Sequence, residues 1–290
     1  MSSFDYDQAF SRNIGWLTKD EQAALRTKRI AIGGLGGVGG AHLLTLTRLG
    51  IGRFTLADFD TFDLVNFNRQ AGACMSTLGR PKLEVMSAQA RDINPELEIH
   101  GFAAGIDRDN LEAFLQDVDL YVDGLDFFAF EARRAVFAAC HRKGIPAITA
   151  APLGMGAAVV NFLPGKMSFA DYFAFTDGAP EEYPLRFMLG LAPARLQMGY
   201  LADPSAVDLA LQKGPSTGMA CQLCAGVAAT EALKILLGRG PVRAAPWGYH
   251  FDAYLNRFCR TWRPMGNRNP WQRFMLRLAK IKLARLASNS

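Results

Sequence analysis

The chain has 290 residues, half of them hydrophobic, which is enough apolar material to bury a large core in one elaborated domain or two closely joined lobes. Its five cysteines follow no disulfide framework, and the first residues, MSSFDYDQAF, lack the basic start and the apolar core of an export signal. We also expect no apolar stretch to be long enough to cross a bilayer. These observations argue against a secreted disulfide scaffold and predict a cytoplasmic location.

The net charge of +5 is unevenly distributed along the chain. Residues 265–290 contain six cations and no acid, so the other residues together carry a net charge of −1. Because this larger part has no basic stripe, the sequence gives no indication of a specific nucleic-acid site.

Helices and strands alternate along the first half of the chain. Residues 5–28 read as helical, with Thr18 as an N-cap, and residues 219–237 form a second long helical pattern. The further predicted elements are strands at 29–33, 53–58, 97–102, 119–123, 146–150 and 157–162, helices at 39–49, 81–92, 109–116 and 129–143, and closing strands around 248–262. This order predicts an α/β fold with a Rossmann-like, doubly wound and mostly parallel sheet, which C-terminal strands and helices close.

Residues 165–216 interrupt this regular order. They contain five prolines, show poor periodicity, and carry many aromatic residues that we expect to be exposed. So long a connection in a compact domain is more often functional than a plain linker. We therefore predict a crossover or lid segment here.

A glycine-rich turn follows the first strand, in RIAIGGLGGVGG at 29–40. Gly34, Gly36 and Gly39 fit G-x-G-x-x-G, in which the glycines permit a tight turn, a close approach of backbone N–H groups to a phosphate, and close packing of the helix. Asp58, 24 positions after Gly34 in the DFD motif, is placed to accept a ribose hydroxyl, and Asp60 of the same motif is a further candidate. A tight strand-to-helix turn without a ligand remains the alternative.

The residues after this acid favour adenylation over hydride transfer. Asn66 and Arg69 lie in NFNRQ, Lys82 follows in GRPKLE, and Asp126 ends LYVDGLD, all just past strands or at helix starts. When a carboxylate attacks an α-phosphate and expels pyrophosphate, cations and a metal must spread the developing negative charge. Arg69 and Lys82 are suited to this role, and Asp126 is suited to holding magnesium.

Together, GGLGGVGG, DFD, N-x-x-R-Q, G-x-P-K and the late D-x-x-D, with Arg12 upstream in FSRNIG, resemble the ThiF/MoeB/HesA family, bacterial relatives of ubiquitin-activating enzymes. The resemblance covers roughly residues 8–262. It implies a homodimer that binds ATP and magnesium and adenylates a carboxylate, often the C-terminal glycine of a ubiquitin-like sulfur carrier. It assigns Gly37 and Asp58 to the nucleotide, Asn66, Arg69 and Lys82 to the phosphates, Asp126 to magnesium, and Arg12 to ATP bound by the neighbouring subunit. A surface ion pair or a cap is the alternative for each of these residues.

The chain departs from the family pattern at its cysteines. Many members hold a structural zinc with two C-x-x-C pairs, whereas this chain has only Cys221 and Cys224, so we predict no zinc. Residues 165–216 contain no cysteine, which argues against an obligatory thioester on the crossover segment. Cys221 and Cys224 either pack a helix tightly on the sheet or form a reactive pair near the start of that helix. Phe127 and Phe128 stand where family members often have a small polar residue.

We divide the chain into an adenylating domain at 1–264 and a basic amphipathic tail at 265–290. The tail carries Trp271, Phe274, Leu278 and Ile281 at helical spacing, opposite a mostly basic face. It is suited to an anionic membrane surface or an acidic partner. Docking on the chain's own domain, with the basic face in solvent, is the alternative.

Three functions remain at this point. The first is an ATP-dependent adenylyltransferase acting on a ubiquitin-like carrier, a peptide or a small acid. The second is an NAD(P)-binding oxidoreductase, which the glycine turn and Asp58 alone support. The third is a non-catalytic subunit that binds a ubiquitin-like protein.

Overall fold

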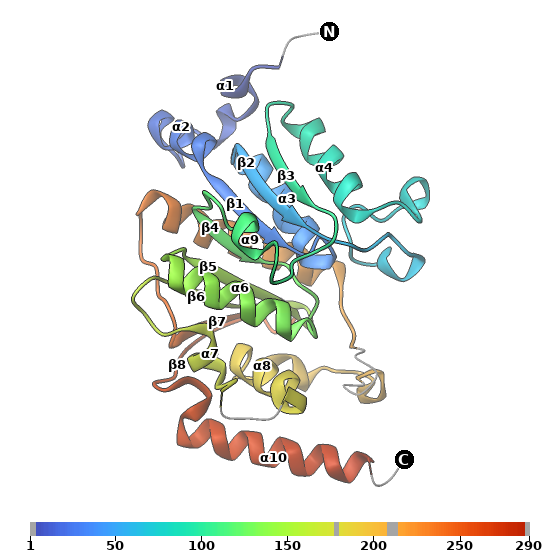
Figure 1. Cartoon of the computed structure of the whole chain (residues 1–290). Helices are drawn as coiled ribbons and strands as arrows, with labels where there is room; N and C mark the ends of the chain where they lie inside the picture. The colour runs from blue at the N-terminus through green and yellow to red at the C-terminus, as the bar shows by residue number, and fades with distance from the viewer. Residues whose placement is uncertain (1–3, 177–179, 208–213, 288–290) are drawn as a thin grey trace.

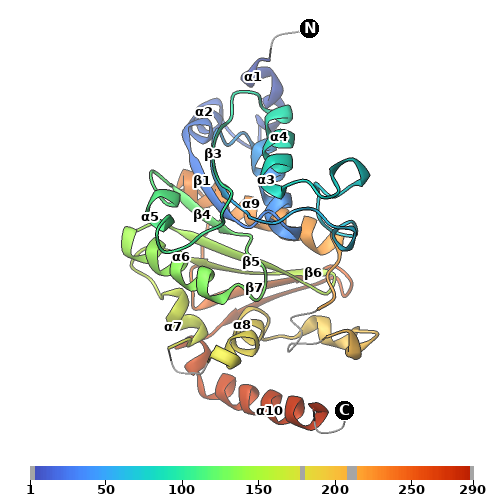
Figure 2. The same cartoon turned by 45° about the vertical axis from the view of Figure 1, so that its right-hand side comes forward.

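An eight-stranded sheet runs through the computed structural model, which describes residues 4–176, 180–207 and 214–287, with side chains of the last helix up to residue 281 (Figures 1 and 2). The strands are β1 (Arg29–Gly33), β2 (Arg53–Ala57), β3 (Glu98–Phe102), β4 (Leu120–Asp123), β5 (Ala147–Leu153), β6 (Gly156–Phe162), β7 (Trp247–Asp252) and β8 (Arg257–Trp262). Their order is β3-β2-β1-β4-β5-β6-β7-β8, parallel from β3 to β5 and antiparallel from β5 to β8. The predicted mostly parallel sheet with closing C-terminal strands is confirmed.

Helices cover both faces of the central part of this sheet, where β1, β4 and β6 are buried along their whole length. Ile30 and Ile32 face one core cluster and Ala31 faces the other, as expected when successive side chains alternate across a strand. The first cluster lies under α3 (Gly37–Leu49), α4 (Lys82–Ile93) and α9 (Gly218–Leu237), and the second under α5 (Leu111–Phe114), α6 (Phe130–Lys143), α7 (Phe169–Phe173) and α8 (Tyr183–Leu191). Figure 1 shows α10 (Pro270–Ala287) outside this layer, beyond α8.

The N-terminal segment differs from the single helix predicted at 5–28. It consists of α1 (Tyr6–Ala9), a 3-10 turn at Ser11–Asn13 and α2 (Lys19–Thr27). Gly15 lies between them with φ +110°, a conformation that a helix cannot contain. The predicted cap is present: the Thr18 hydroxyl accepts from the Glu21 N–H at 3.1 Å, and the Glu21 carboxylate accepts from the Thr18 N–H at 2.8 Å.

The prediction of exposed aromatics in residues 165–216 was wrong. Six aromatic residues of this segment are buried in one cluster: Phe169, Tyr172, Phe173, Phe175, Tyr183 and Phe187. The helices that carry them, α7 and α8, have five and nine residues. One or two turns are too short for helical periodicity to be visible in the sequence.

Helix α9 corrects the expectation that no apolar stretch is long enough to cross a bilayer. Its 20 residues have a mean hydropathy of 1.4, so by length and composition alone it is long and apolar enough. However, it contacts α3, β5 and β6, and its buried face consists largely of alanine with Cys221 and Cys224. Burial raises the pKa of both thiols, which supports the packing interpretation over a reactive pair.

Three glycines form the closest contact between the first strand, its helix and the end of β4. Gly34 has φ +81°, and a Cβ there would lie 2.3 Å from the Gly124 carbonyl oxygen. A Cβ at Gly39, in the first turn of α3, would lie 1.8 Å from the Gly34 carbonyl oxygen. Since real Cβ atoms do not approach backbone this closely, no larger residue fits unless the main chain moves.

We predict that Gly39→Ala costs about 3 kcal/mol of stability or more, because overpacking here must separate α3 from the sheet. Gly226→Ala is the matched control, since Gly226 also lies within a helix but has open space around its Cβ position. The control should be stabilised by about 0.5–1 kcal/mol, the helix preference of alanine over glycine. Urea unfolding of both variants measures the difference, and equal midpoints would contradict the contact.

Candidate nucleotide site

The candidate site lies at the carboxyl ends of the parallel strands. Here β1 lies between β2 and β4, which pair with it on its two sides. Open α/β sheets bind ligands at such a switch point. Helix α3 begins here at Gly37, and its N-cap, Gly36, supplies no side-chain hydrogen bond. The N–H groups of the first turn therefore remain available to an anion, and the helix dipole adds partial positive charge.

Asp58 connects the end of β2 to the glycine turn. One of its carboxylate oxygens accepts from the Leu35 N–H at 2.6 Å, and the other accepts from the Asp60 N–H at 2.8 Å. Partial burial raises the pKa of this carboxyl, although the two N–H groups act against the shift. These bonds fix the carboxylate beside the turn, and each oxygen retains a lone pair for a ribose hydroxyl.

Lys82 and Asp60 form an ion pair at the start of α4. The Lys82 ammonium lies 3.1 Å from the Asp60 carboxylate, and the Lys82 N–H donates to the Asp60 carbonyl at 2.9 Å. Lys82 is buried whereas Asp60 is exposed. In this arrangement Asp60 positions the lysine, and two of the three ammonium protons remain available for phosphate oxygens.

Arg69 lies beside the first turn of α3. A Cβ at Gly37 would lie 3.6 Å from its Cγ, while its guanidinium donates to the Val65 carbonyl and the Asn68 side chain, both at 2.9 Å. Asn66 is buried in the preceding 3-10 turn, where its side-chain oxygen accepts from the Asp63 N–H at 3.0 Å. The structure therefore brings Arg69 to the glycine turn, and it gives Asn66 a role in shaping the segment that carries Arg69.

Asp126 is exposed two residues beyond Gly124. One carboxylate oxygen accepts from the Phe128 N–H at 2.9 Å, which leaves the other without a hydrogen bond among the described residues. No group of three His, Cys, Asp or Glu side chains converges in the part of the chain that the structure describes. A single carboxylate fits Mg²⁺, which usually keeps its waters and shares substrate phosphates with one or two protein ligands.

A buried ion pair that the sequence analysis did not identify supports the loop carrying Asp126. The Arg133 Nε atom lies 2.8 Å from the Asp123 carboxylate, which also accepts from the Thr149 hydroxyl at 2.9 Å. The remaining Arg133 nitrogens donate to the carbonyls of Leu125 and Asp126 at 2.8 Å and of Phe127 at 3.1 Å. Arg133 is 2% exposed. An arginine within the otherwise apolar-rich pattern FEARRAVFAAC, ten residues after Asp123, was the available signal.

The same arginine connects the Asp126 loop to α8. Its guanidinium carbon lies 4.8 Å from the centre of the Phe187 ring, and the rings of Phe127 and Phe187 are 5.4 Å apart. Phe127 and Phe128 are partly buried and meet edge to face at 4.9 Å. The segment at 165–216 thus packs directly on the loop that presents Asp126.

Arg12 lies far from the glycine turn of its own chain. The arm around it is fixed to the C-terminal end of α3, where the Asn13 amide donates to the Leu49 carbonyl at 3.2 Å and the Tyr6 hydroxyl to the Gly50 carbonyl at 2.5 Å. The glycine turn is at the other end of this helix, about 20 Å away for 13 residues at 1.5 Å per residue. Arg12 is exposed and makes no ion pair or hydrogen bond within the described residues, including the nearby acids Asp5 and Asp7.

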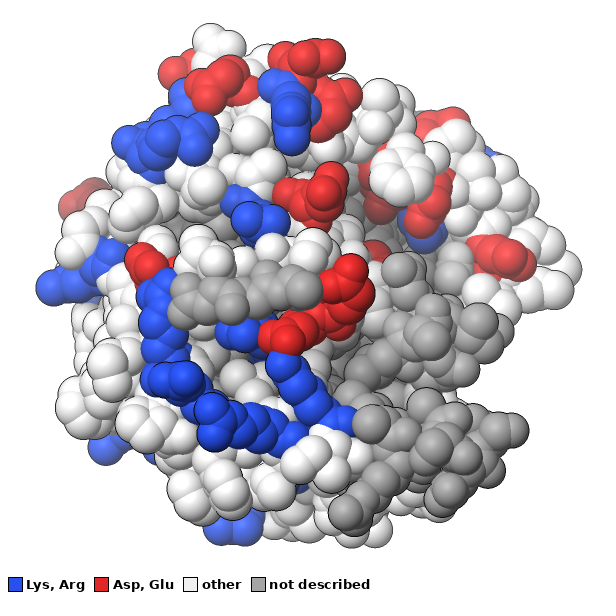
Figure 3. Space-filling view, turned by 60° about the horizontal axis from the view of Figure 1, so that its bottom comes forward, with Lys and Arg blue, Asp and Glu red and all other residues white. Residues whose placement is uncertain are grey.

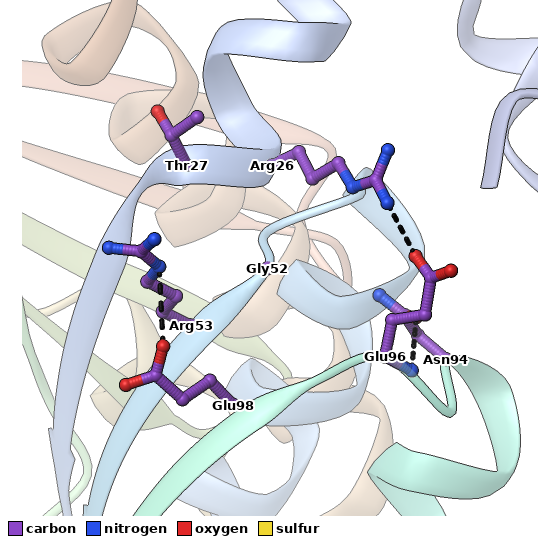
Figure 4. Close-up of a pocket in the computed structure, with 7 residues that line it drawn as sticks. All are labelled: Arg26, Thr27, Gly52, Arg53, Asn94, Glu96 and Glu98. Atoms are coloured by element: carbon purple, nitrogen blue, oxygen red, sulfur yellow. Dashed lines mark hydrogen bonds and ion pairs between the residues drawn. The ribbon is translucent and has the colours of Figure 1, made fainter.

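A pocket of about 320 Å³ lies at the opposite, amino-terminal edge of the sheet (Figure 4). Two ion pairs line it, Arg26 with Glu96 at 2.7 Å and Arg53 with Glu98 at 3.4 Å. In Figure 4 a dashed line joins each of these arginines to its glutamate. We do not assign the nucleotide to this pocket, because parallel α/β sheets bind ligands at their carboxyl edge.

The family model described as the ThiF family matches residues 10–273. Molybdopterin-synthase adenylyltransferase from Escherichia coli K12 is 35% identical over 222 residues, which are 76% of this chain and 78% of that protein. A tRNA threonylcarbamoyladenosine dehydratase from Bacillus subtilis is 35% identical over 150 residues, 51% of this chain and 57% of the relative. The chain therefore spans only about half the length of this dehydratase and of several other curated relatives that it matches.

Solved structures show the same fold at lower identity. E. coli MccB with ATP has a TM-score of 0.65 and 18% identity, covering 91% of this chain and 74% of the other. E. coli tRNA N6-threonylcarbamoyladenosine dehydratase, TcdA, has a TM-score of 0.58 and 23% identity, covering 80% and 95% respectively.

We predict that Arg133→Met costs about 3–5 kcal/mol of stability, because it leaves Asp123 buried and unpaired. The adjacent Arg134 is the matched control, since it is half-buried and its guanidinium only lies over the Tyr183 ring, 5.1 Å from the ring centre. Arg134→Met should cost about 1 kcal/mol or less. Adding Asp123→Asn to Arg133→Met should recover part of the loss. Urea unfolding provides the comparison, and similar costs for the two arginines would disprove the assignment.

Proposed function

The chain belongs to the ThiF family, and we propose that it is an ATP- and magnesium-dependent adenylyltransferase that activates a carboxylate as an acyl adenylate. The observation that carries the proposal is the contact of Arg69 with the start of α3, together with two indirect links to the glycine turn. Lys82 pairs with Asp60, whose N–H donates to the Asp58 carboxylate that accepts from Leu35 in the turn, and Asp126 follows Gly124, which packs on Gly34. An oxidoreductase would use the turn and Asp58 but would leave Arg69, Lys82 and Asp126 without a task. A non-catalytic subunit would need none of them.

In the proposed reaction each residue acts on a different part of ATP. Asp58 accepts ribose hydroxyls, and the N–H groups at the start of α3 receive phosphate oxygens. A carboxylate oxygen of the substrate attacks the α-phosphorus, and the bond to the bridging oxygen breaks, so that pyrophosphate leaves with the electron pair. Arg69 and Lys82 offset the charge that develops on these oxygens. Magnesium held by Asp126 would add charge neutralisation at the phosphates.

We propose that the adenylate passes directly to its acceptor, without an obligatory thioester on the enzyme. The sequence has no cysteine between Cys140 and Cys221. Cys221 is the thiol beside the glycine turn, since its sulfur would lie 3.1 Å from a Cβ at Gly37, but it is buried and burial raises its pKa. The carboxylate would belong to a ubiquitin-like sulfur carrier, a peptide or a small acid.

Two further predictions from the sequence remain proposals, namely the absence of zinc and a cytoplasmic location. Cys221 and Cys224 offer two thiols, and in the described part of the chain no third His, Cys, Asp or Glu joins them. Two thiolates supply half of a tetrahedral zinc site.

We predict that Asp126→Asn abolishes carboxylate-dependent exchange of pyrophosphate into ATP while the fold persists. Asparagine keeps the oxygen that accepts from the Phe128 N–H and removes only the charge. Asp109→Asn is the control, because Asp109 is an exposed acid in the loop before α5. Exchange should be screened with carrier proteins, peptides and small acids, and calorimetry should show ATP binding in preference to NAD. Full exchange by Asp126→Asn would remove Asp126 from the site, and tight NAD binding without ATP binding would favour the oxidoreductase.

We also propose a homodimer in which Arg12 reaches ATP bound by the other subunit. Arg12 is exposed, and its arm is fixed to the end of α3 opposite its own chain's glycine turn, so it could reach a phosphate only in the other subunit. Two surfaces are suited to contact with a second copy. Trp16, on the same arm, is 85% exposed, and the edge strand β8 presents Phe258 and Trp262 more than half exposed.

Subunit mixing tests this arrangement. Arg12→Ala and Asp126→Asn should each be inactive, but a mixed dimer contains one site with both residues intact. After random exchange we expect about a quarter of wild-type exchange activity, since half of the dimers are mixed and each has one complete site. No recovery after verified subunit exchange, or a monomer at working concentration, would contradict the proposal.

A further inference from the structure

Helix α10 is attached to the molecule by one of its three faces. Leu276 packs with Leu185 and Leu189 of α8, and Met188 and Ala279 lie against this small cluster. The Gln272 amide donates to the Leu189 carbonyl at 2.7 Å. The expectation that the helix docks on its own domain therefore holds for this face.

The apolar face of α10, however, is not the one that docks. Trp271, Phe274, Leu278 and Ile281 are between 44% and 68% exposed. At 100° per residue these four side chains share one side of the helix, about 15 Å long from Trp271 to Ile281. Docking thus leaves a row of large apolar side chains in water, which has an unfavourable hydration free energy unless something covers it.

A basic face lies between the docked face and the apolar face. Arg273, Arg277 and Lys280 are exposed there. Lys280 pairs with Glu182, whereas Arg273 and Arg277 make no ion pair within the described residues. Figure 3, seen from the side of α10, shows Lys and Arg side chains gathered in a row with a small acidic group beside them. The helix itself contains no acid, and Lys282 and Arg285 add two further cations by sequence.

We propose that α10 binds an anionic membrane surface, with its apolar face among the lipid chains and its basic face at the headgroups. Between residues 271 and 281 every exposed side chain is either apolar or cationic, because the single neutral polar one, Gln272, is bonded to α8. A lipid surface requires only apolar depth and positive charge, and this combination is the pattern of interfacial helices. An acidic protein would be expected to meet some neutral hydrogen-bonding groups.

A second copy of the chain is a less suitable occupant of this face. Two α10 helices brought together through their apolar rows would also bring together Arg273 and Arg277 of each copy. In the described part of α10 no acidic side chain is available to neutralise them. An anionic bilayer instead attracts these charges. Residues 1–264 carry a net charge of only −1, so they compete little with the bilayer for the cations of α10.

Flotation of the full chain with lipid vesicles tests the proposal independently of adenylation. Vesicles of phosphatidylcholine with phosphatidylglycerol should retain the protein, vesicles of phosphatidylcholine alone should not, and binding should weaken as salt rises. Arg273→Gln with Arg277→Gln should weaken partitioning about 25-fold, roughly fivefold for each cation. Arg91→Gln with Arg142→Gln is the control, because it removes the same charge from exposed positions on α4 and α6. Trp271→Ser with Phe274→Ser should weaken binding about tenfold or more.

Three outcomes would overturn the proposal. In the first, the wild-type chain fails to bind anionic vesicles, or the control loses as much affinity as the α10 variant. In the second, soluble polyglutamate binds as tightly as vesicles and Trp271→Ser with Phe274→Ser has no effect, which would indicate an acidic partner. In the third, the same apolar variant changes the oligomeric state in sedimentation experiments, which would assign the face to a second copy. Circular dichroism of each variant establishes that it is folded.

Discussion

The backbone contact among Gly34, Gly39 and Gly124 determines how closely the first helix can approach the sheet at its switch point. It sets the start of α3 against the end of β4, and the parallel register places Gly33 beside both Ala57 and Asp123. Asp58 and Asp126, which follow these two strand ends, therefore lie on either side of one helix terminus. A phosphate group bound there would contact main-chain N–H groups at the start of α3. The side chains around that helix start would contact it from the sides.

The polar side chains and loops around the start of α3 are held in place by hydrogen bonds and ion pairs. Lys82 is paired with Asp60, Asp58 is bonded to the turn that it adjoins, and Arg133 satisfies three carbonyls of the Asp126 loop. The peptide oxygens of that loop are bonded to Arg133, whereas the Asp126 carboxylate is exposed, and one of its oxygens has no hydrogen bond among the described residues. This arrangement resembles preorganisation, in which charged groups are already oriented before the substrate arrives.

Much of this architecture could be predicted from the sequence because it depends on local patterns. Strand and helix alternation, the glycine spacing and the acids at strand ends all lie within short windows, and the structure confirms the sheet that they predicted. For the Asp123–Arg133 pair the sequence offered only an arginine in an apolar-rich pattern, and its partner could not be predicted, since that depends on which face of α6 meets β4. The buried aromatic cluster of residues 165–216 and the exposure of the apolar row of α10 depend on tertiary packing in the same way.

Helix α8 packs against two parts of the molecule, one on each of its sides. Phe187 lies against Arg133 and Phe127 on its inner side, while Leu185 and Leu189 hold α10 on its outer side. A single helix of nine residues thus lies between the loop bearing Asp126 and the C-terminal helix. If the position of α8 responds to what α10 contacts, thermodynamic linkage requires the effect to be reciprocal: a ligand that stabilises the Asp126 loop would change the affinity of α10 for its surface by the same factor. Helix α8 would then couple ligand binding at the Asp126 loop to the binding of α10 to its surface.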